Sequence, residues 1–367
     1  MMALAVIAAL FFACQSGTNN KNQIPLYIGT YTNNGSEGIY TALFDTLTGQ
    51  LSELQLAARL TNPSFLAINK PDKLLVAVSE NDGSRANVFS YRIDLKSGAL
   101  TLLDSVSTGG QGSCYVSMVN KDIVAIANYS SGDVSFIPYN RKGTFEAPVS
   151  TFKHSGSGPV SDRQGAPHAH SIRPDPSGPF IYAADLGADK VMVYELTDQE
   201  VRAAGTIMIT PGAGPRHLAF SPCGQQMALL NELNHSVITF SKDEEGAFTN
   251  QTATVPLLPD SLHAENKSAD IHYSPDGKFL YASVRGVDQI EVMDVGDKAL
   301  APVLVGSEGN GIKWPRNFAH DPSGKFLLVA NQNGHNITVY KRDINTGQLA
   351  PMDVSLELNS PVCIQFY

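Results

Sequence analysis

The chain has 367 residues, of which 43% are hydrophobic and 17% charged, and its formal net charge at pH 7 is -9. That length and apolar content suffice for a packed core, either in two ordinary domains or in one large repetitive domain. Acidic and basic residues are mixed along the chain without a basic stripe, which argues against a nucleic-acid partner and favours a small molecule.

Residues 1–22 are predicted to be an export leader followed by a polar spacer. An apolar run of about a dozen residues fits the hydrophobic segment of an export signal and is too short to span a bilayer. Ala13-Cys14 loosely resembles a bacterial lipobox, so Cys14 is a candidate for lipidation and for the only membrane attachment. We therefore expect a periplasmic protein or a membrane-anchored lipoprotein, and a cytoplasmic protein if the leader is not functional.

Residues 23–367 repeat one pattern of short strands. A strand of alternating polarity, a turn such as Pro-Asp-Gly or Pro-Ser-Gly, and a second apolar strand follow one another. A third strand and usually a fourth complete a unit of about fifty residues, which is typical of a propeller blade. Copies of the pattern begin at Pro63, Gly112, Pro167, Pro215, Ile271 and Pro315.

The two ends of the repeated region complement each other. The first unit lacks its proline-led first strand, and the C-terminal SPVCIQFY is a proline-led strand with nothing after it. Pairing the two would close a ring and leave no exposed edge between its ends. The sequence therefore predicts an all-β fold, a single domain over 23–367 that is a seven-bladed β-propeller with four-stranded blades.

This geometry gathers distant polar residues at one mouth of the central channel, where each first strand starts and each second strand ends. The expected first-strand starts carry His168, His170, Arg216, His217, His272, Arg316 and Asn317. The expected second-strand ends carry Glu80, Asn128, Asp185, Asn231, Glu232, Arg285 and Asn331. Arginines that converge with carboxylates and histidines indicate a pocket for an anionic ligand.

His168 and His170 stand two residues apart, so in an extended strand both rings would face the same side. The pair alone leaves open a metal, an acid/base pair or no chemistry. No metal is expected, because arginines beside the ligands would repel a divalent cation. Ser171 lacks a G-x-S-x-G setting and is interpreted as a strand hydroxyl. The remaining cysteines, which have no metal-type spacing and are expected to be buried, are Cys114, Cys223 and Cys363.

Several stretches carry a resemblance to a known family. They are GTYT at 29–32, GAPHAHS at 165–171, GPRHLAFSP at 214–222, NEL at 231–233, IHYSPDGKFLYASVRG at 271–286 and PRNFAHDPSGKFLLVANQ at 315–332. In these stretches, and in their order, the chain resembles the seven-bladed β-propeller lactonase family, which includes propeller-type 6-phosphogluconolactonases and carboxy-muconate lactonizing enzymes. One departure is Val284, where an asparagine is common in the family.

The resemblance implies a catalytic group made of His168 or His170 with Arg216, Glu232 and Arg285. A histidine would act as base, arginines would bind the anionic group and the oxyanion, and Glu232 would orient them or act as base itself. The expected activity is hydrolysis of an anionic sugar lactone at the channel mouth, without a cofactor. Residues expected to bind substrate are Glu80, Asn128, His217, His272, Arg316 and Asn331.

Two alternatives stay open. The same mouth could hold a peptide or carbohydrate without turnover in a binding propeller on the cell envelope, although a scaffold has no need for buried charges there. A muconate-type lactonizing enzyme would run the reverse cyclisation with similar residues. Because the leader predicts export whereas sugar phosphates are cytoplasmic, an unphosphorylated or otherwise anionic lactone is favoured.

Overall fold

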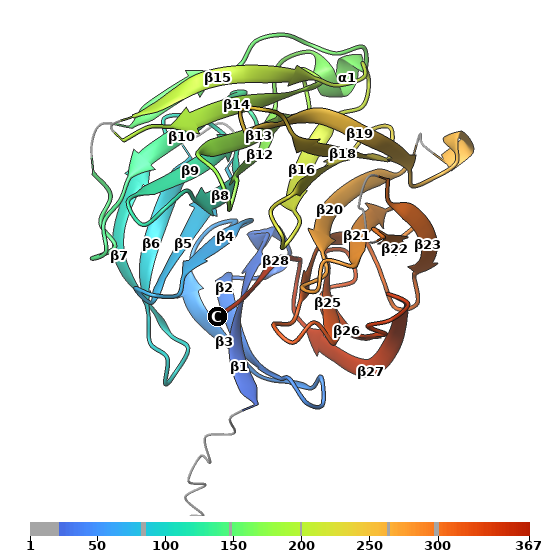
Figure 1. Cartoon of the computed structure of the whole chain (residues 1–367). Coiled ribbons are helices and arrows are strands. Elements are labelled where there is room, and N and C mark those ends of the chain that lie inside the picture. Colours follow the sequence, from blue (N-terminus) through green and yellow to red (C-terminus); the bar gives the residue numbers. More distant parts are fainter. Residues whose placement is uncertain (1–21, 82–85, 147–148, 199, 263–264, 297–300) are drawn as a thin grey trace, which may run out of the picture.

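The computed structural model describes residues 22–81, 86–146, 149–198, 200–262, 265–296 and 301–367. These form seven four-stranded antiparallel sheets arranged in a ring (Figure 1). The predicted leader lies outside the described residues except for Asn22, and it stays a prediction. Among the described residues, no helix has the length and apolar character needed to cross a membrane.

The sheets are numbered here as blades 1 to 7, each given from its innermost strand outward. Blade 1 contains β28 (Pro361–Phe366), β1 (Gln23–Thr30), β2 (Gly38–Asp45) and β3 (Leu51–Arg59). Blade 2 contains β4 (Leu66–Asn69), β5 (Leu74–Ser79), β6 (Asn87–Ile93) and β7 (Leu100–Ser107). Blade 3 contains β8 (Ser113–Met118), β9 (Ile123–Asn128), β10 (Asp133–Pro138) and β11 (Ser150–Lys153).

Blade 4 contains β12 (Ala169–Pro174), β13 (Phe180–Asp185), β14 (Lys190–Leu196) and β15 (Val201–Met208). Blade 5 contains β16 (Pro215–Phe220), β17 (Gln226–Asn231), β18 (Ser236–Lys242) and β19 (Phe248–Pro256). Blade 6 contains β20 (Lys267–Tyr273), β21 (Phe279–Arg285), β22 (Gln289–Asp294) and β23 (Val303–Glu308). Blade 7 contains β24 (Pro315–His320), β25 (Phe326–Asn331), β26 (Asn336–Arg342) and β27 (Leu349–Glu357).

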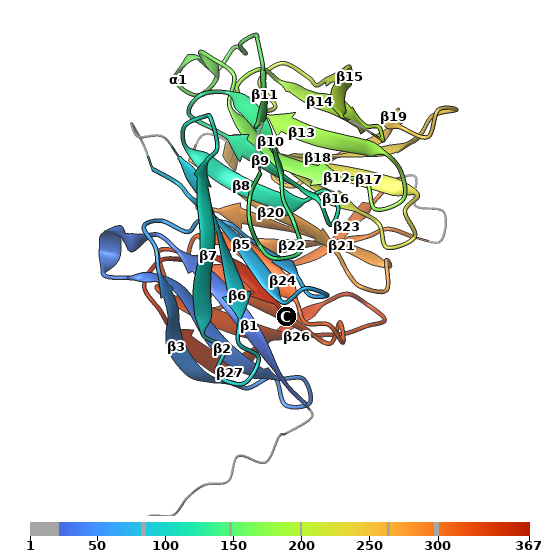
Figure 2. The same ribbon diagram turned by 90° about the vertical axis from the view of Figure 1, so that its left-hand side faces the viewer.

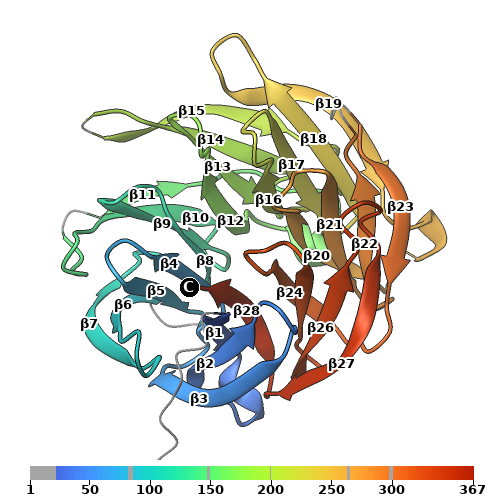
Figure 3. The same ribbon diagram turned by 60° about the horizontal axis from the view of Figure 1, so that its bottom comes forward.

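Three short helices connect the strands: η1 (Thr32–Asn34), α1 (Ser161–Gln164) and η2 (Asp260–Leu262). Helix α1 lies at the edge of the molecule in two views related by 90° (Figures 1 and 2). The innermost strands of neighbouring blades contact one another around the ring, and β3, β7, β15, β19, β23 and β27 lie outermost (Figure 3).

Burial follows this radial order. The second strands β5, β17 and β25 are buried along their whole length, whereas the outermost strand β15 is mostly exposed. The buried apolar side chains of the described residues form seven clusters, and each cluster joins two neighbouring blades. The hydrophobic effect therefore holds the blades together face to face, so no blade can bury its apolar surface alone.

The predicted ring closure is confirmed. Strand β28 pairs antiparallel with β1, from Leu26 opposite Phe366 to Thr30 opposite Pro361. The chain ends therefore share one blade, in which a C-terminal strand supplies the innermost position. Ile364 of β28 is 2% exposed and belongs to the cluster between blades 7 and 1.

A β-bulge near the start of the innermost strand recurs in five blades and was not predicted. The register jumps over Cys114 in blade 3, His170 in blade 4, Arg216 in blade 5 and Arg316 in blade 7. A fifth jump of the same kind, in blade 1, passes over Val362 of β28. A bulged residue is left out of the ladder, and its side chain is redirected. In blade 6 the jump spans two residues, 269 and 270.

Two expectations from the sequence are wrong. His272 was assigned to a first-strand start, but β20 begins earlier, at Lys267, so His272 lies opposite Tyr281 and away from the mouth. The extra bulge residues before Ile271 obscured this start in the repeat alignment. Cys223 is exposed rather than buried, because it occupies the tight turn between β16 and β17.

We expect that ring closure depends on the packing of β28. Ile364→Ala should lower the free energy of unfolding by about 2–5 kcal/mol, because the truncation leaves a cavity between two blades. The matched control Ile344→Ala removes the same atoms from a side chain that is 50% exposed, and should change stability by no more than about 0.5 kcal/mol. Urea unfolding of both variants measures the difference, and equal effects would contradict this account of closure.

Candidate active site

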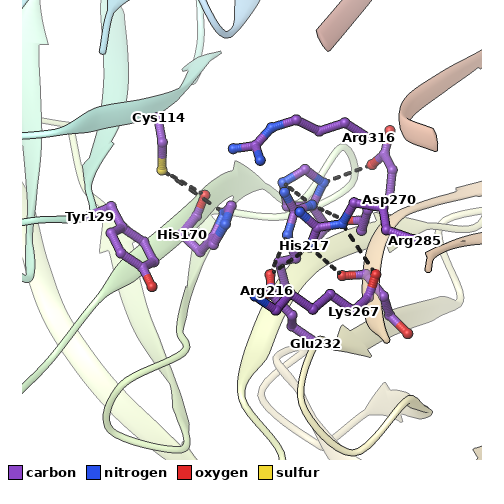
Figure 4. Close-up of polar contacts among 12 residues, drawn as sticks. Cys114, Tyr129, His170, Arg216, His217, Glu232, Lys267, Asp270, Arg285 and Arg316 are labelled. Carbon is purple, nitrogen blue, oxygen red and sulfur yellow. Dashed lines mark hydrogen bonds and ion pairs between the residues drawn. The ribbon is translucent and has the colours of Figure 1, made fainter. Parts of the chain in front are cut away.

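A pocket of about 290 Å³ lies where the innermost strands start and the second strands end. Blades 2 to 7 all contribute to it (Figure 4). Its lining residues are Glu80, Cys114, Tyr129, Arg163, His170, Glu232, Lys267, Arg285, Trp314 and Arg316. Four cationic side chains against two carboxylates give this small site a positive character.

Glu232 follows the end of β17, and its carboxylate is the centre of an arginine cluster. Arg163 Nη2 donates to Oε1 at 2.6 Å, whereas Arg216 Nε and Arg285 Nη2 donate to Oε2 at 2.9 and 3.1 Å. Burial alone would raise the pKa of Glu232, but Arg285, Arg216 and Arg163 outweigh it and hold this pKa well below its usual range. Glu232 is therefore a carboxylate at neutral pH, and both of its oxygens are occupied.

Arg216, the bulge residue of β16, is 2% exposed and lies beneath the pocket rather than lining it. Besides Glu232, its guanidinium donates to the carbonyl oxygen of Ala269 in the next blade and to His217 Nε2, at 3.2 Å. Arg285 donates to the carbonyl oxygens of Lys267 and Ser268. Because these two arginines are committed to buried acceptors, they hold Glu232 in one position.

A second buried carboxylate, Asp270, lies below this cluster and was missed in the sequence. Its oxygens accept hydrogen bonds from His217 Nδ1 at 2.7 Å, His272 Nε2 at 2.9 Å and Asn317 Nδ2 at 2.5 Å. Burial would raise the pKa of Asp270, but His272 and His217 keep it well below its usual range. Asp270 thus connects blades 5, 6 and 7, and His217 and His272 bind it instead of lining the pocket.

His217 is held as a neutral imidazole. Burial and the nearby Arg216 lower its pKa to about 3, despite the hydrogen bond to Asp270. Since its Nδ1 hydrogen points to Asp270, Nε2 carries the lone pair that accepts from Arg216. Both nitrogens are occupied, so His217 is a structural support for Arg216 and is not available as a base.

His170, by contrast, presents an unoccupied nitrogen to the pocket. Its Nδ1 lies 3.9 Å from Cys114 Sγ, and its Nε2 makes no hydrogen bond with any residue that the structure describes. Burial, followed by Arg216 and His217, lowers the pKa of His170 well below its ordinary value. The ring is therefore neutral at pH 7, which leaves a nitrogen lone pair in the pocket.

His168 does not share this position, because His170 sits in the bulge and His168 precedes the strand. The His168 ring stacks on Tyr129 with centroids 4.5 Å apart, and its Nδ1 lies 2.9 Å from the Tyr129 carbonyl oxygen. Both rings contact Tyr129, since the His170 centroid lies 5.3 Å from that of Tyr129, but only His170 lines the pocket. Cys114 lines the pocket next to His170, and burial raises the pKa of its thiol, so the sulfur is not a ready nucleophile.

On the other side of the mouth, Glu80 and Arg316 are linked through Tyr31. Arg316 donates to the Tyr31 hydroxyl at 2.6 Å, and that hydroxyl donates to Glu80 at 2.9 Å. The Arg316 guanidinium also lies over the Tyr31 ring, 5.0 Å from its centroid. Although burial opposes it, the interactions with Tyr31 and Glu80 raise the pKa of Arg316, so this cation persists at the pocket.

Asn128 and Asn331 were predicted to bind substrate, but both are fully buried and bind their own blades. Asn128 interacts with Ser113 and Asp133, and Asn331 accepts from the backbone of Lys313 while its amide donates to Asn336. Neither lines the pocket. They fix the ends of the second strands, and thereby the positions of the residues that follow.

The lining residues that the sequence reasoning missed include Tyr129, Arg163, Lys267 and Trp314. Tyr129 and Trp314 stand next to predicted positions, directly after Asn128 and two residues before Arg316. Arg163 comes from α1, a loop helix without a counterpart in the repeat. Among the described residues, no group of three or more His, Cys, Asp or Glu is arranged to hold a metal ion.

A larger cavity of about 810 Å³ lies elsewhere, along the ends of the innermost strands where the chain turns back. Its charged residues are Arg173 and Asp175, and both are already occupied. Arg173 donates to the Leu218 carbonyl oxygen, and Asp175 pairs with Lys242. Size therefore does not identify the site, whereas the convergence of charged groups and a free imidazole does.

Comparison with known proteins gives consistent matches over nearly the whole described chain. Residues 25–366 match the model of the family described as "Lactonase, 7-bladed beta-propeller". A 6-phosphogluconolactonase of Bacillus subtilis is 37% identical over 345 residues, which cover 93% of this chain and 97% of that protein. A periplasmic gluconolactonase of Pseudomonas aeruginosa has a solved structure that superposes with a TM-score of 0.88 at 33% identity, covering 94% of this chain and 99% of that one.

Glu232→Gln should destabilise the protein by about 3–5 kcal/mol, because it leaves buried arginines without a counter-charge and turns an amide NH₂ toward a guanidinium. The depressed pKa of Glu232 means that its stabilisation is present above the unfolded-state value and is lost as the pH falls through the folded-state value. The difference in the free energy of unfolding between wild type and Glu232→Gln should thus stay constant above about pH 5 and become smaller below about pH 4.

Urea unfolding of both proteins across this pH range provides the measurement. Glu244→Gln, at an exposed position, is the control and should leave stability unchanged at every pH. A stability difference between wild type and Glu232→Gln that does not change with pH would contradict the assignment of a buried carboxylate.

Proposed function

Because the chain belongs to the seven-bladed β-propeller lactonase family, we propose that it hydrolyses an anionic sugar lactone of the 6-phosphogluconolactone type in the channel-mouth pocket. Relatives named as a 6-phosphogluconolactonase and a gluconolactonase support the reaction class. The observation that carries the proposal is the free imidazole nitrogen of His170 in a pocket lined by four cationic side chains. A base next to cations suits attack by water on an ester carbonyl.

In this mechanism His170 is the general base. It takes a proton from a water molecule as the water oxygen bonds to the lactone carbonyl carbon, and the carbonyl oxygen becomes an oxyanion. Arg316, across the mouth from Glu232 and held by Tyr31, is placed to stabilise that charge. The ring C–O bond then breaks, and the imidazolium returns its proton to the leaving ring oxygen. The product is a hydroxy acid, which ionises at neutral pH.

Glu232 acts as an orienting group in this scheme and not as the base. Its oxygens are occupied by three arginines, so neither faces a water molecule as the His170 nitrogen does. By holding Arg216, it fixes the charge that acts together with burial to lower the pKa of His170 and keep that ring neutral, although Glu232 itself acts in the opposite direction. A scaffold that binds without turnover has no need for this arrangement, so catalysis is favoured over a binding propeller.

The reverse cyclisation of a muconate-like acid uses the same residue types and is the second candidate. It would replace water with a carboxylate of the substrate as nucleophile, in the same positive pocket. We place the protein in the periplasm, as the predicted leader over 1–22 and the periplasmic relative suggest. That location favours lactones that reach the periplasm, whether phosphorylated or carrying another anionic group.

Removing the base should abolish most of the activity. His170→Ala should lower kcat by about 10²–10⁴-fold, the range expected for a lost general base. His168→Ala serves as the matched control, because His168 is the same residue type, lies two positions away and does not line the pocket. This variant should lose far less activity. Proton release from 6-phosphogluconolactone, gluconolactone and a carboxymuconolactone measures both, and no turnover by wild type on any of them would favour the binding propeller.

The pH dependence gives a further test of the base. Because the pKa of His170 is lowered well below 6.5, the neutral form that accepts a proton persists in mildly acidic solution. The acid limb of kcat/KM should therefore lie below the ordinary histidine value of about 6.5. Initial rates corrected for spontaneous hydrolysis, taken between pH 4 and 8, locate the limb, and a midpoint at or above 6.5 would exclude His170 as the base.

A further inference from the structure

One part of the pocket holds positive charge that the protein itself does not neutralise. The ammonium group of Lys267 makes no hydrogen bond or ion pair with any residue in the described ranges, although the side chain lines the pocket. Nη1 of Arg163 is buried and has no hydrogen-bond partner. A buried donor without an acceptor, such as Nη1 of Arg163, is costly in a folded protein, and the half-buried Lys267 lines the same pocket. The two groups are therefore candidates for binding a ligand.

The other cations of the site are already used. Arg216 and Arg285 donate to Glu232 and to backbone carbonyl oxygens, and Arg316 donates to Tyr31. Both oxygens of Glu232 are in turn occupied, so it has no free oxygen for another cation. Since Arg316 is assigned to the oxyanion, Lys267 and Arg163 remain as the two side chains with donors for a second anionic group.

The neighbourhood of Lys267 is unfavourable to its own charge. Burial and the adjacent Arg163 lower the pKa of Lys267, and Arg285 acts in the same direction, whereas Glu232 opposes them without reversing the shift. Like charges gathered in a partly buried site repel one another with little screening, and a bound anion would offset this repulsion. An anion is thus the ligand class that the local electrostatics favour, whereas a metal ion would add to the repulsion.

Lys267 stands apart from the proposed base. It begins β20 in blade 6, whereas His170 lies in β12 of blade 4, so blade 5 separates them. The two groups lie in different parts of the site, with His170, Cys114 and Tyr129 on one side and Lys267 with Glu232 on the other (Figure 4). A substrate with its carbonyl at His170 would extend its far end toward Lys267.

We infer that Lys267, assisted by Arg163, binds the anionic substituent of the lactone and so selects charged lactones over neutral ones. This inference rests on the proposed function. An ammonium group is a compact point charge suited to a phosphate or a carboxylate of varied orientation. Because the contact is remote from the reacting carbonyl, it contributes binding energy equally to the ground and transition states and acts mainly on KM.

The test is Lys267→Met, which keeps the length and apolar stem of the side chain and removes its charge. Lys267 accepts from Arg285 through its backbone oxygen and not through its side chain, so the arginine cluster should persist in this variant. For 6-phosphogluconolactone, kcat/KM should fall about 10- to 100-fold through KM, the loss expected for a hydrogen bond to a charged group. For gluconolactone, which is neutral, kcat/KM should change by less than about threefold.

Two further variants make the comparison specific. Lys267→Arg keeps the charge and should retain most of the preference for the phosphorylated lactone. Lys121→Met removes a lysine whose side chain is 64% exposed outside the pocket, and it should leave both substrates unaffected. Equal losses on the charged and neutral lactones, or no loss on the charged one, would overturn the inference.

Failure of the inference can be distinguished from failure of the proposed function. If wild type hydrolyses neither lactone, the proposed function fails, and the anion site is then tested by calorimetric binding of 6-phosphogluconate. Weaker binding by Lys267→Met than by wild type would support the site without catalysis. Equal binding by the two proteins, or binding by neither, would overturn it.

Discussion

The site depends on the burial of one negative charge. A carboxylate removed from water is tolerated only when its oxygens are fully paired, and Glu232 achieves this with arginines from three different parts of the chain. Arg163 comes from α1, Arg216 from blade 5 and Arg285 from blade 6. The same requirement therefore draws three segments together at one point, and the pocket is the space that remains between them and blades 2, 3, 4 and 7.

Asp270 repeats this principle one layer deeper. It ties His217 of blade 5 and Asn317 of blade 7 to blade 6, and Asn317 in turn accepts from the backbone of Ile364 in the closing strand β28. The apolar clusters hold neighbouring blades face to face without strict geometry, whereas these hydrogen bonds fix position and direction. Catalytic precision at the mouth is thus supported by polar contacts in the channel that reach as far as the closure of the ring.

The fold was predictable because it is repeated: each blade shows the same alternation and turn, and the two incomplete ends account for the closure. The site was less predictable because it lies where the repeat is broken. Strand alternation placed His168 and His170 together, but a single bulge residue separates them. Two extra residues in β20 displaced His272 and hid Asp270. Arg163 gave no signal, because its helix has no counterpart in the repeat, and Lys267 was missed because the start of β20 was placed too late.

The distribution of charge connects these observations. The three carboxylates of the site and its support all have partners within the protein. Glu232 pairs with Arg163, Arg216 and Arg285. Glu80 is linked to Arg316 through Tyr31, and Asp270 accepts from His217, His272 and Asn317. Two donor groups, the ammonium of Lys267 and Nη1 of Arg163, have no hydrogen-bond or ion-pair partner among the described residues. Since a protein gains no stability from donors left unpaired in a partly buried site, we interpret their presence as stability given up for function. The anionic group of the substrate would then supply the missing counter-charge, so that Lys267 and Arg163 become paired when substrate binds and not when the protein folds.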